Sequence, residues 1–284
     1  MTKFAKLQAV GNDFLVLPVD TVQDPLNTAG RLARRMCHRH YGAGADGLIL
    51  VSRAVTKDAD FDSRIFNADG GEAEISGNGT RCLAAYLYHA GLQTGPDVRI
   101  GTKAGVKVGR LVSRQEGLFD FEFDMGIPRL ASNEIPINID PPVNRVTNHS
   151  IGAGDQTFVV TCTSMGNPHC SLFVNEFDDA FIDRAGPLIE NSPLFPERTN
   201  VEFVKILSRD AIEVRYWERG VGRTMSSGTG SCGASVASAI CGLTNRQVTV
   251  NTQGGVLIVD WRDDDRVLLT GQAQMIYQGE WLAG

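Results

Sequence analysis

Short runs of apolar or alternating residues, separated by Gly, Asp and Asn, recur along the whole chain. Runs of this length, bounded by turn residues, are typical of β-strands. Around residue 120, Phe119, Phe121 and Phe123 alternate with acidic residues, as expected of a strand with one buried and one solvated face. Strands are predicted at Phe14–Val19, Leu48–Val51, Val106–Val112, Leu118–Phe123, Phe158–Cys162, Ala211–Trp217 and Val256–Val259, with a final strand from about Ile276 that returns to the first half of the chain.

Helical periodicity is confined to four stretches. The predicted helices are Thr28–His40 behind an Asn27 cap, the stretch after Gly79 to about His89, Phe181–Glu190, and the stretch after Gly230 to about Cys241. The second and fourth follow Gly-rich turns directly and continue with small or apolar residues. Helices of this composition pack closely, and their N-termini point into the preceding turn.

An internal repeat relates the two halves of the chain. The segment from Arg64 to Gly79 aligns without a gap with the segment from Arg215 to Gly230, at an offset of 151 residues. Upstream, Gly11-Asn12 matches Gly166-Asn167 at an offset of 155. One Ser-Gly-x-Gly match could be coincidence among 31 glycines, but two paired motifs in one order favour duplication. The predicted halves are residues 1–118 with a C-terminal strand at 275–284, and residues 119–274.

Two Ser-Gly-x-Gly turns that each open a helix supply two sets of backbone N–H groups and two positive dipole ends. If the halves face each other, these N-termini converge on one cleft, where a carboxylate or a developing enolate would be held from two sides. The surrounding polar residues suit a zwitterion, since Asn donates and accepts while Glu and Arg match an ammonium and a carboxylate. They are Asn12, Asn67, Asn78, Asn167, Asn200, Glu218 and Arg219. The alternative is that these residues only make turns and a solvated ion pair.

Charge and composition narrow the classes of partner. The net charge of −6, with scattered Lys and Arg, provides no basic stripe for nucleic acid. No apolar run approaches 18 residues and the first residues lack the apolar core of a signal peptide, so we expect no membrane partner and a cytoplasmic location. The six cysteines form no C-x-x-C pair, which predicts reduced thiols and no structural metal.

Eight short strings, in order along residues 11–230, resemble the signatures of the diaminopimelate epimerase family. They are Gly11-Asn12-Asp13-Phe14, Gly42-Ala43-Gly44-Ala45-Asp46-Gly47, Phe66-Asn67-Ala68-Asp69-Gly70, Gly77-Asn78-Gly79-Thr80-Arg81-Cys82, Gly166-Asn167-Pro168-His169, Arg198-Thr199-Asn200-Val201-Glu202-Phe203, Glu218-Arg219-Gly220 and Gly228-Thr229-Gly230. Together they are highly specific.

The resemblance implies an α+β fold of two pseudo-symmetric β-rich half-domains, each a curled mixed sheet around a central helix. It also implies cofactor-independent inversion at the α-carbon of LL- or meso-diaminopimelate, a small amino-acid substrate, by two opposed bases. In the family both bases are cysteines, directly before Gly-Asn-Gly and Gly-Thr-Gly. Here these positions are Ser76 and Ser227.

By similarity, the substrate contacts are Asn12, Asn67, Gly77, Asn78, Asn167, Asn200, Glu218, Arg219, Gly228 and Thr229. His169 is a candidate to support one base, although a core or turn histidine fits its position equally. No cofactor or metal is expected, and a homodimer is expected by resemblance alone. Closure of the halves around the substrate would exclude water from the reacting carbon.

Serine at both base positions leaves several functions open, because a hydroxyl is far less acidic than a thiol and needs an adjacent base. Cys82 and Cys232 lie too far along their helices to replace the serines. The chain could be a slow epimerase, or one whose cysteines were exchanged for serine. It could be a one-base dehydratase of a hydroxyproline-like substrate, or a non-catalytic amino-acid-binding protein. A serine hydrolase is not favoured, since Ser227 lacks the G-x-S-x-G elbow.

Overall fold

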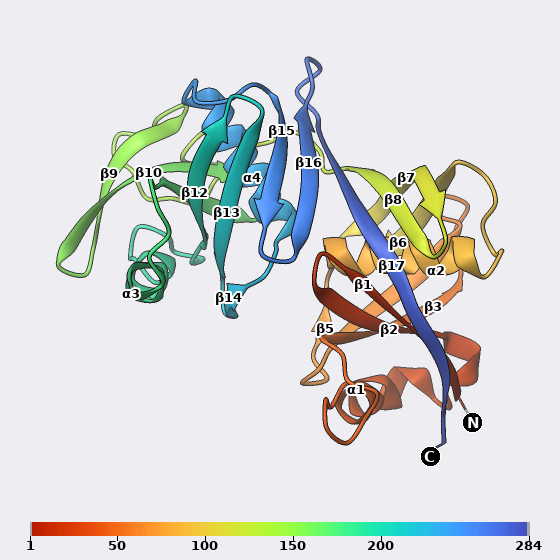
Figure 1. The fold of residues 1–284 in the computed structure, drawn as a ribbon. Coiled ribbons are helices and arrows are strands. Elements are labelled where there is room, and N and C mark those ends of the chain that lie inside the picture. The colour runs from red at the N-terminus through yellow and green to blue at the C-terminus, as the bar shows by residue number, and fades with distance from the viewer. Residues whose placement is uncertain (1, 283–284) are drawn as a thin grey trace. The chain divides into compact units, whose positions relative to one another are not determined.

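The computed structural model describes residues 2–282, and the chain divides into two compact units (Figure 1). One unit comprises residues 2–123 with residues 271–282, and the other comprises Asp124–Thr270. The sequence prediction had placed these divisions after residues 118 and 274. The strand β8 (Leu118–Asp124) pairs antiparallel with β7 (Gly105–Gln115), and this pairing keeps all but its last residue in the first unit.

The first unit is a mixed sheet with two α-helices and a short 3-10 helix in its described residues. Its other strands are β1 (Thr2–Ala9), β2 (Asn12–Pro18), β3 (Gly47–Arg53), β4 (Phe61–Asn67), β5 (Glu72–Ala73), β6 (Asp97–Thr102) and most of β17 (Val267–Trp281). Its helices are the short 3-10 turn η1 (Val19–Thr21), α1 (Pro25–Met36) and α2 (Gly77–His89). The last strand pairs antiparallel with β1 from Trp281 back to Gln274. The predicted return of the C-terminal strand to the first half is therefore confirmed.

The second unit is built in the same way. Its strands are β9 (Val146–Ala153), β10 (Gln156–Ser164), β11 (Pro168–Phe173), β12 (Asn200–Ser208), β13 (Ala211–Glu218), β14 (Gly222–Thr224), β15 (Gln247–Thr252) and β16 (Gly255–Trp261). Its helices are α3 (Asp179–Glu190) and α4 (Gly228–Ile240).

The order of strand pairings repeats between the units. In the first unit, β1 to β4 pair antiparallel, parallel and antiparallel in turn, and β4 then pairs antiparallel with β5 and parallel with β6. In the second unit, β10 to β13 show the same three pairings, and β13 pairs antiparallel with β14 and parallel with β15. This repeated topology supports the duplication, and the mixed sheets with few helices confirm the α+β class.

In the first unit, the central strands are buried on both faces because a helix covers each face. Along β2, Leu15 and Leu17 pack with residues of α1 such as Ala33 and Met36. The alternate residue Phe14 lies against the start of α2, within reach of Gly79. Most of α2 is buried around its whole circumference, which is why its sequence lacks a polar face.

In the second unit, the sheet face towards α3 is apolar, whereas the opposite face also carries buried polar side chains. Cys170, Leu172 and Phe203 pack against α3. The alternate residues of the same strands, His169 and Glu202, therefore face α4; a side chain at Gly233 of that helix would meet His169. Strand alternation thus buries two ionisable groups beneath the helix that Ser227 caps.

The predicted first helix was wrong at both ends. It begins at Pro25 behind Asp24 rather than behind Asn27, because proline has the φ angle of a first helical turn and needs no N–H partner there. It ends at Met36 rather than at residue 40. The ring Nδ1 of His38 accepts hydrogen bonds from the backbone of His40 and Tyr41, which stabilises a turn in place of further helix.

The prediction from sequence missed nine strands of the described chain, several of which interleave polar residues with short apolar runs. They are β1, β4, β6, β9, β11, β12 and β15 and the short β5 and β14. Among residues 2–282, no helix combines the length and the apolar character needed to cross a membrane.

Candidate active site

The two predicted base positions, Ser76 and Ser227, are helix N-caps with the same geometry. Ser76 precedes α2 with φ −136° and ψ 120°, and Ser227 precedes α4 with φ −138° and ψ 126°. The hydroxyl of Ser76 accepts a hydrogen bond from Gly79 N at 3.0 Å, and that of Ser227 accepts from Gly230 N at 3.3 Å. Serine is a favoured N-cap for this reason. Each serine therefore lies at the positive end of a helix dipole.

Ser227 also contacts a carboxylate. Its hydroxyl donates to Oε2 of Glu218 at 3.2 Å, where β13 ends before its hairpin with β14. Since an ionised carboxylate only accepts hydrogen bonds, the hydroxyl proton points at Glu218. The pair has the arrangement of a hydroxyl with an adjacent base, which a serine requires in order to take a proton from carbon.

A chain of hydrogen bonds runs beneath the start of α4. Glu202 Oε1 and His169 Nδ1 are 2.7 Å apart, and both side chains are almost wholly buried. Burial raises the pKa of the Glu202 carboxyl, although His169 opposes the shift. His169 Nε2 lies 3.0 Å from Asn167 Oδ1, and Asn167 Nδ2 lies 3.4 Å from Thr229 Oγ1. The three predicted residues His169, Asn167 and Thr229 thus form one chain, and Glu202 lies at its buried end. The sequence prediction missed Glu202, although a single Glu among apolar residues could have indicated it.

Asn200 connects this chain to the hairpin that bears Glu218. The side-chain amide of Asn200 donates to the carbonyl of Pro168 at 2.9 Å and accepts from the backbone N–H of Arg219 at 3.0 Å. The guanidinium of Arg219 donates to the carbonyl of Glu197 at 2.9 Å. Hydrogen bonds therefore link the hairpin after β13 to the start of β11, which bears His169.

In the first unit, Asn12 and Asn78 are brought together, with Nδ2 of Asn78 donating to Oδ1 of Asn12 at 3.3 Å. Asn78 lies in the first turn of α2, directly after Gly77. Asn67 is exposed, and its backbone closes the turn after β4 through bonds with Gly70 and Gly71.

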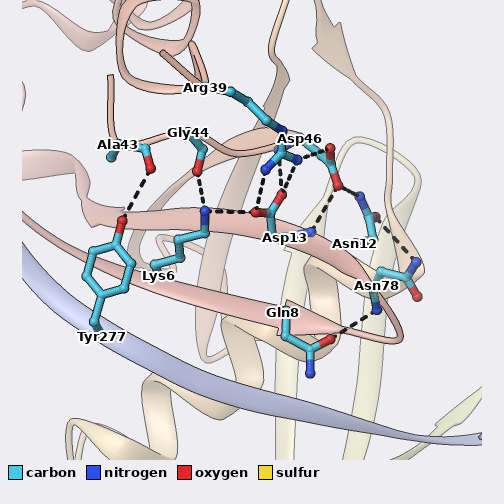
Figure 2. Close-up of polar contacts among 11 residues, drawn as sticks. Lys6, Gln8, Asn12, Asp13, Arg39, Ala43, Gly44, Asp46, Asn78 and Tyr277 are labelled. Atoms are coloured by element: carbon cyan, nitrogen blue, oxygen red, sulfur yellow. Dashed lines mark hydrogen bonds and ion pairs between the residues drawn. The ribbon is translucent and has the colours of Figure 1, made fainter. Parts of the chain in front are cut away.

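A second set of residues missed by the sequence prediction surrounds Asn12. Asp46 Oδ2 accepts from Asn12 Nδ2 at 2.6 Å, and Arg39 bridges Asp46 and Asp13 (Figure 2). Lys6 forms an ion pair with Asp13 at 2.8 Å. Asp13 and Asp46 belong to strings that carried the family resemblance, so the sequence marked both residues. It did not indicate which side chains they would contact.

The two units are unequal in charge at matching positions. At the offset of 151 residues, Glu218 of the second unit corresponds to Asn67 of the first. At the offset of 155, His169 corresponds to Phe14. Ser227 therefore has ionisable groups nearby that Ser76 lacks at the equivalent places.

The cysteines near the two serines are core residues, as predicted. Cys82 and Cys232 are both fully buried within their helices, and desolvation raises the pKa of the Cys82 thiol far above its ordinary value. A thiol in this state is not a base at neutral pH.

Known proteins resemble this chain over nearly its whole length. The diaminopimelate epimerase family model matches residues 4–131 and 161–276. Diaminopimelate epimerases of Pelotomaculum thermopropionicum and Moorella thermoacetica are each 42% identical to it over 280 residues, with 98% of both chains covered. A probable proline racemase from Agrobacterium radiobacter has a similar fold, with a TM-score of 0.68 at 16% identity over 100% of this chain and 94% of the other. The extent of these matches places the chain in the diaminopimelate epimerase family.

Proposed function

We propose that this protein acts on LL- and meso-diaminopimelate as a cofactor-independent epimerase, with Ser76 and Ser227 at the two base positions. The observation that carries the proposal is the matched pair of helix N-caps, each with its hydroxyl held at the first turn of a buried helix. A carboxylate of the substrate, and the negative charge that develops beside it, would be stabilised by such helix starts.

The remaining contacts support an amino-acid substrate. The carboxylate of Glu218 accepts a hydrogen bond from the Ser227 hydroxyl. The amide oxygen of Asn200 accepts from the backbone N–H of Arg219, and the guanidinium of Arg219 donates to the carbonyl of Glu197. A pre-arranged set of donors and acceptors of both charges suits a ligand that carries ammonium and carboxylate groups. Asn12, Asn67, Gly77, Asn78, Asn167, Gly228 and Thr229 complete the proposed contacts.

Proton transfer would begin at Ser227. As the Cα–H bond breaks, its proton passes to Ser227 Oγ while the hydroxyl proton passes to Glu218 Oε2, and the electron pair remains on the substrate as an enolate-like anion. Inversion then requires a proton from Ser76, whose alkoxide would be strongly disfavoured with Asn67, an amide, in the place equivalent to Glu218. We therefore propose slow inversion, limited by the transfer at Ser76.

The test is α-proton exchange in D₂O, followed by NMR, on LL- and meso-diaminopimelate. It compares the parent protein with a Ser76→Cys, Ser227→Cys double variant. Slow exchange in the parent and rapid inversion in the double variant would support the proposal. Exchange only in the double variant would indicate a binding protein without bases. No exchange in either protein would contradict the assignment and direct the search to hydroxyproline-like substrates.

A further inference from the structure

The side-chain amide of Asn12 has a defined orientation. Its Nδ2 donates to Asp46 Oδ2 at 2.6 Å, and its Oδ1 accepts from Asn78 at 3.3 Å (Figure 2). Asn78 supports this orientation from one side, because its own amide oxygen accepts from Arg81 and its N–H group donates to Asn12. Asp46 supports it from the other side, since a carboxylate only accepts.

Asp46 is itself held through both carboxylate oxygens. Oδ1 accepts from Arg39 Nη2 at 2.7 Å, while Oδ2 accepts from the backbone N–H of Asp13 at 3.0 Å in addition to Asn12. These donors come from the loop after α1 and from β2. The carboxylate therefore has little freedom to turn away from Asn12.

Asp13 completes the network from the other side. Its Oδ1 accepts from Arg39 at 2.9 Å and from the backbone N–H of Asp46 at 2.9 Å, and Lys6 lies 2.8 Å from its Oδ2. Burial by itself would raise the pKa of Asp13, but hydrogen bonds from Arg39 and Lys6 hold it below its ordinary value. Asp13, Asp46, Arg39 and Lys6 thus form a cluster with no net charge, in which the hydrogen bonds link all four side chains. Such a network stabilises the arrangement of its members more than an isolated surface ion pair does.

We propose that Asp46 is a positioning residue, which orients Asn12 so that its amide oxygen faces the first turn of α2. In this orientation Asn12 offers an acceptor to an N–H donor of a ligand, such as an ammonium group. The inference rests on the proposed function for the identity of that ligand. Loss of Asp46 would remove the acceptor that fixes Asn12 Nδ2 and leave only the longer bond from Asn78 to hold the amide. In molecules whose amide turns away, the N–H of the ligand would lose its acceptor.

The first test measures the affinity for meso-diaminopimelate by calorimetry in the full-length protein. We expect Asp46→Ala and Asn12→Ala each to weaken binding about tenfold, which corresponds to about 1.4 kcal/mol. The double variant should bind no more weakly than Asn12→Ala alone, because Asp46 acts through Asn12. Multiplied losses in the double variant, or full affinity in Asp46→Ala, would overturn the proposal.

A matched control is Asp60→Ala. Asp60 is also held by an arginine, with bonds to Arg99 Nη2 at 2.7 Å and to Arg99 N at 2.8 Å, but it contacts none of the proposed substrate residues in these bonds. Its removal should leave the affinity unchanged. A loss equal to that of Asp46→Ala would mean that any disrupted ion pair weakens binding, and the positioning role would be rejected.

A second test needs no ligand. The two side-chain amide protons of Asn12, identified by their disappearance in Asn12→Ala, are followed by ¹⁵N–¹H NMR. Asp46→Ala, or the isosteric Asp46→Asn if alanine prevents folding, should shift these signals while Asp60→Ala does not. Unchanged signals would overturn the positioning role. Shifted signals in a protein that fails to bind diaminopimelate would sustain that role while the proposed function falls.

Discussion

At the scale of single residues, the candidate site of the second unit consists of a few polar side chains, each with a defined hydrogen-bond partner. Ser227 contacts Glu218, and His169 contacts Glu202. Each contact joins residues from different strands or from a strand and a helix start. The residue types were visible in the sequence, but the pairings were not.

Glu218→Gln should reduce α-proton exchange by about 10²- to 10⁴-fold, the usual contribution of a positioned base. The amide keeps the size of the side chain but is no longer a base for the proton of Ser227. Initial rates of deuterium incorporation into diaminopimelate provide the measurement. Glu213→Gln, in the same strand, is the control and should retain the parent rate. Equal rates for parent and Glu218→Gln would show that Glu218 takes no proton.

At the scale of elements, the buried helices α2 and α4 determine where the site lies. Each is capped by serine, and each begins with a glycine. The close packing of α4 on the sheet face that carries His169 depends on Gly233, since a Cβ there would lie 2.9 Å from Cβ and Cγ of His169. Cβ and Cγ of His169 are close to the backbone of β11, so they cannot move aside unless the strand moves too.

Gly233→Ala should therefore lower the free energy of unfolding by about 1–3 kcal/mol, the usual cost of overpacking, despite the better helix propensity of alanine. Denaturant titration measures the change. The matched control is Gly152→Ala in β9, where a Cβ would meet nothing within 4 Å, and its stability should be the same or slightly higher. A Gly233→Ala protein as stable as the parent would show that α4 can shift outward at little cost.

The hairpin of β4 and β5 is stabilised by Glu72, which forms bonds with Arg64 and an ion pair with Lys103. The hydrogen bond from Arg64 is the main cause that lowers the Glu72 pKa from 4.5 to about 2. A carboxyl with a depressed pKa stabilises the fold above its unfolded pKa. That contribution is lost as the pH falls from about 4.5 towards 2.

Glu72→Gln should thus cost about 0.5–1 kcal/mol at neutral pH, and the difference from the parent should shrink steadily below pH 4.5. Chemical unfolding at several pH values between 7 and 3 tests both statements. Glu74→Gln removes the same charge from an exposed neighbouring carboxylate, and this control should leave the stability at pH 7 unchanged. A gap for Glu72→Gln that stays constant down to pH 3 would contradict the assigned ion pairs.

At the scale of the whole molecule, the two units share one order of strand pairings but carry different residues at matching positions. The same order of strand pairings surrounds each central helix. Yet Glu218 contacts Ser227, and His169 lies against α4, where the first unit has Asn67 and Phe14. In the proposed two-base reaction, this difference between Ser76 and Ser227 has a measurable consequence.

The single variants Ser76→Cys and Ser227→Cys should each exchange the α-proton of one of the two stereoisomers of diaminopimelate much faster than that of the other. Ser227→Cys should be the faster, because Glu218 can accept the thiol proton. Separate D₂O incubations of each variant with LL- and meso-diaminopimelate, read by NMR, distinguish the two preferences. Exchange of both stereoisomers at equal rates by either variant would show that one unit reaches both faces.

Local sequence determined the strands with clear alternation, such as Leu118–Asp124, the two helices at the Gly-rich turns, and the repeat that relates them. The helices begin at Gly77 and Gly228, whereas the predicted starts lay after Gly79 and Gly230. These features depend on residues that are neighbours along the chain, where side-chain periodicity and capping act directly. The family resemblance likewise rests on short strings, and the family matches have confirmed it.

Only the tertiary structure decided which side chains meet. Asp46 reaches Asn12 from 34 residues away, and Glu202 reaches His169 from 33 residues away. Such contacts depend on which strands pair, in which register, and on which face each residue lies, and a shift of one residue would turn every side chain to the opposite face. The chemistry of the site was therefore present in the sequence as residue types, while its geometry arose from the packing of distant segments.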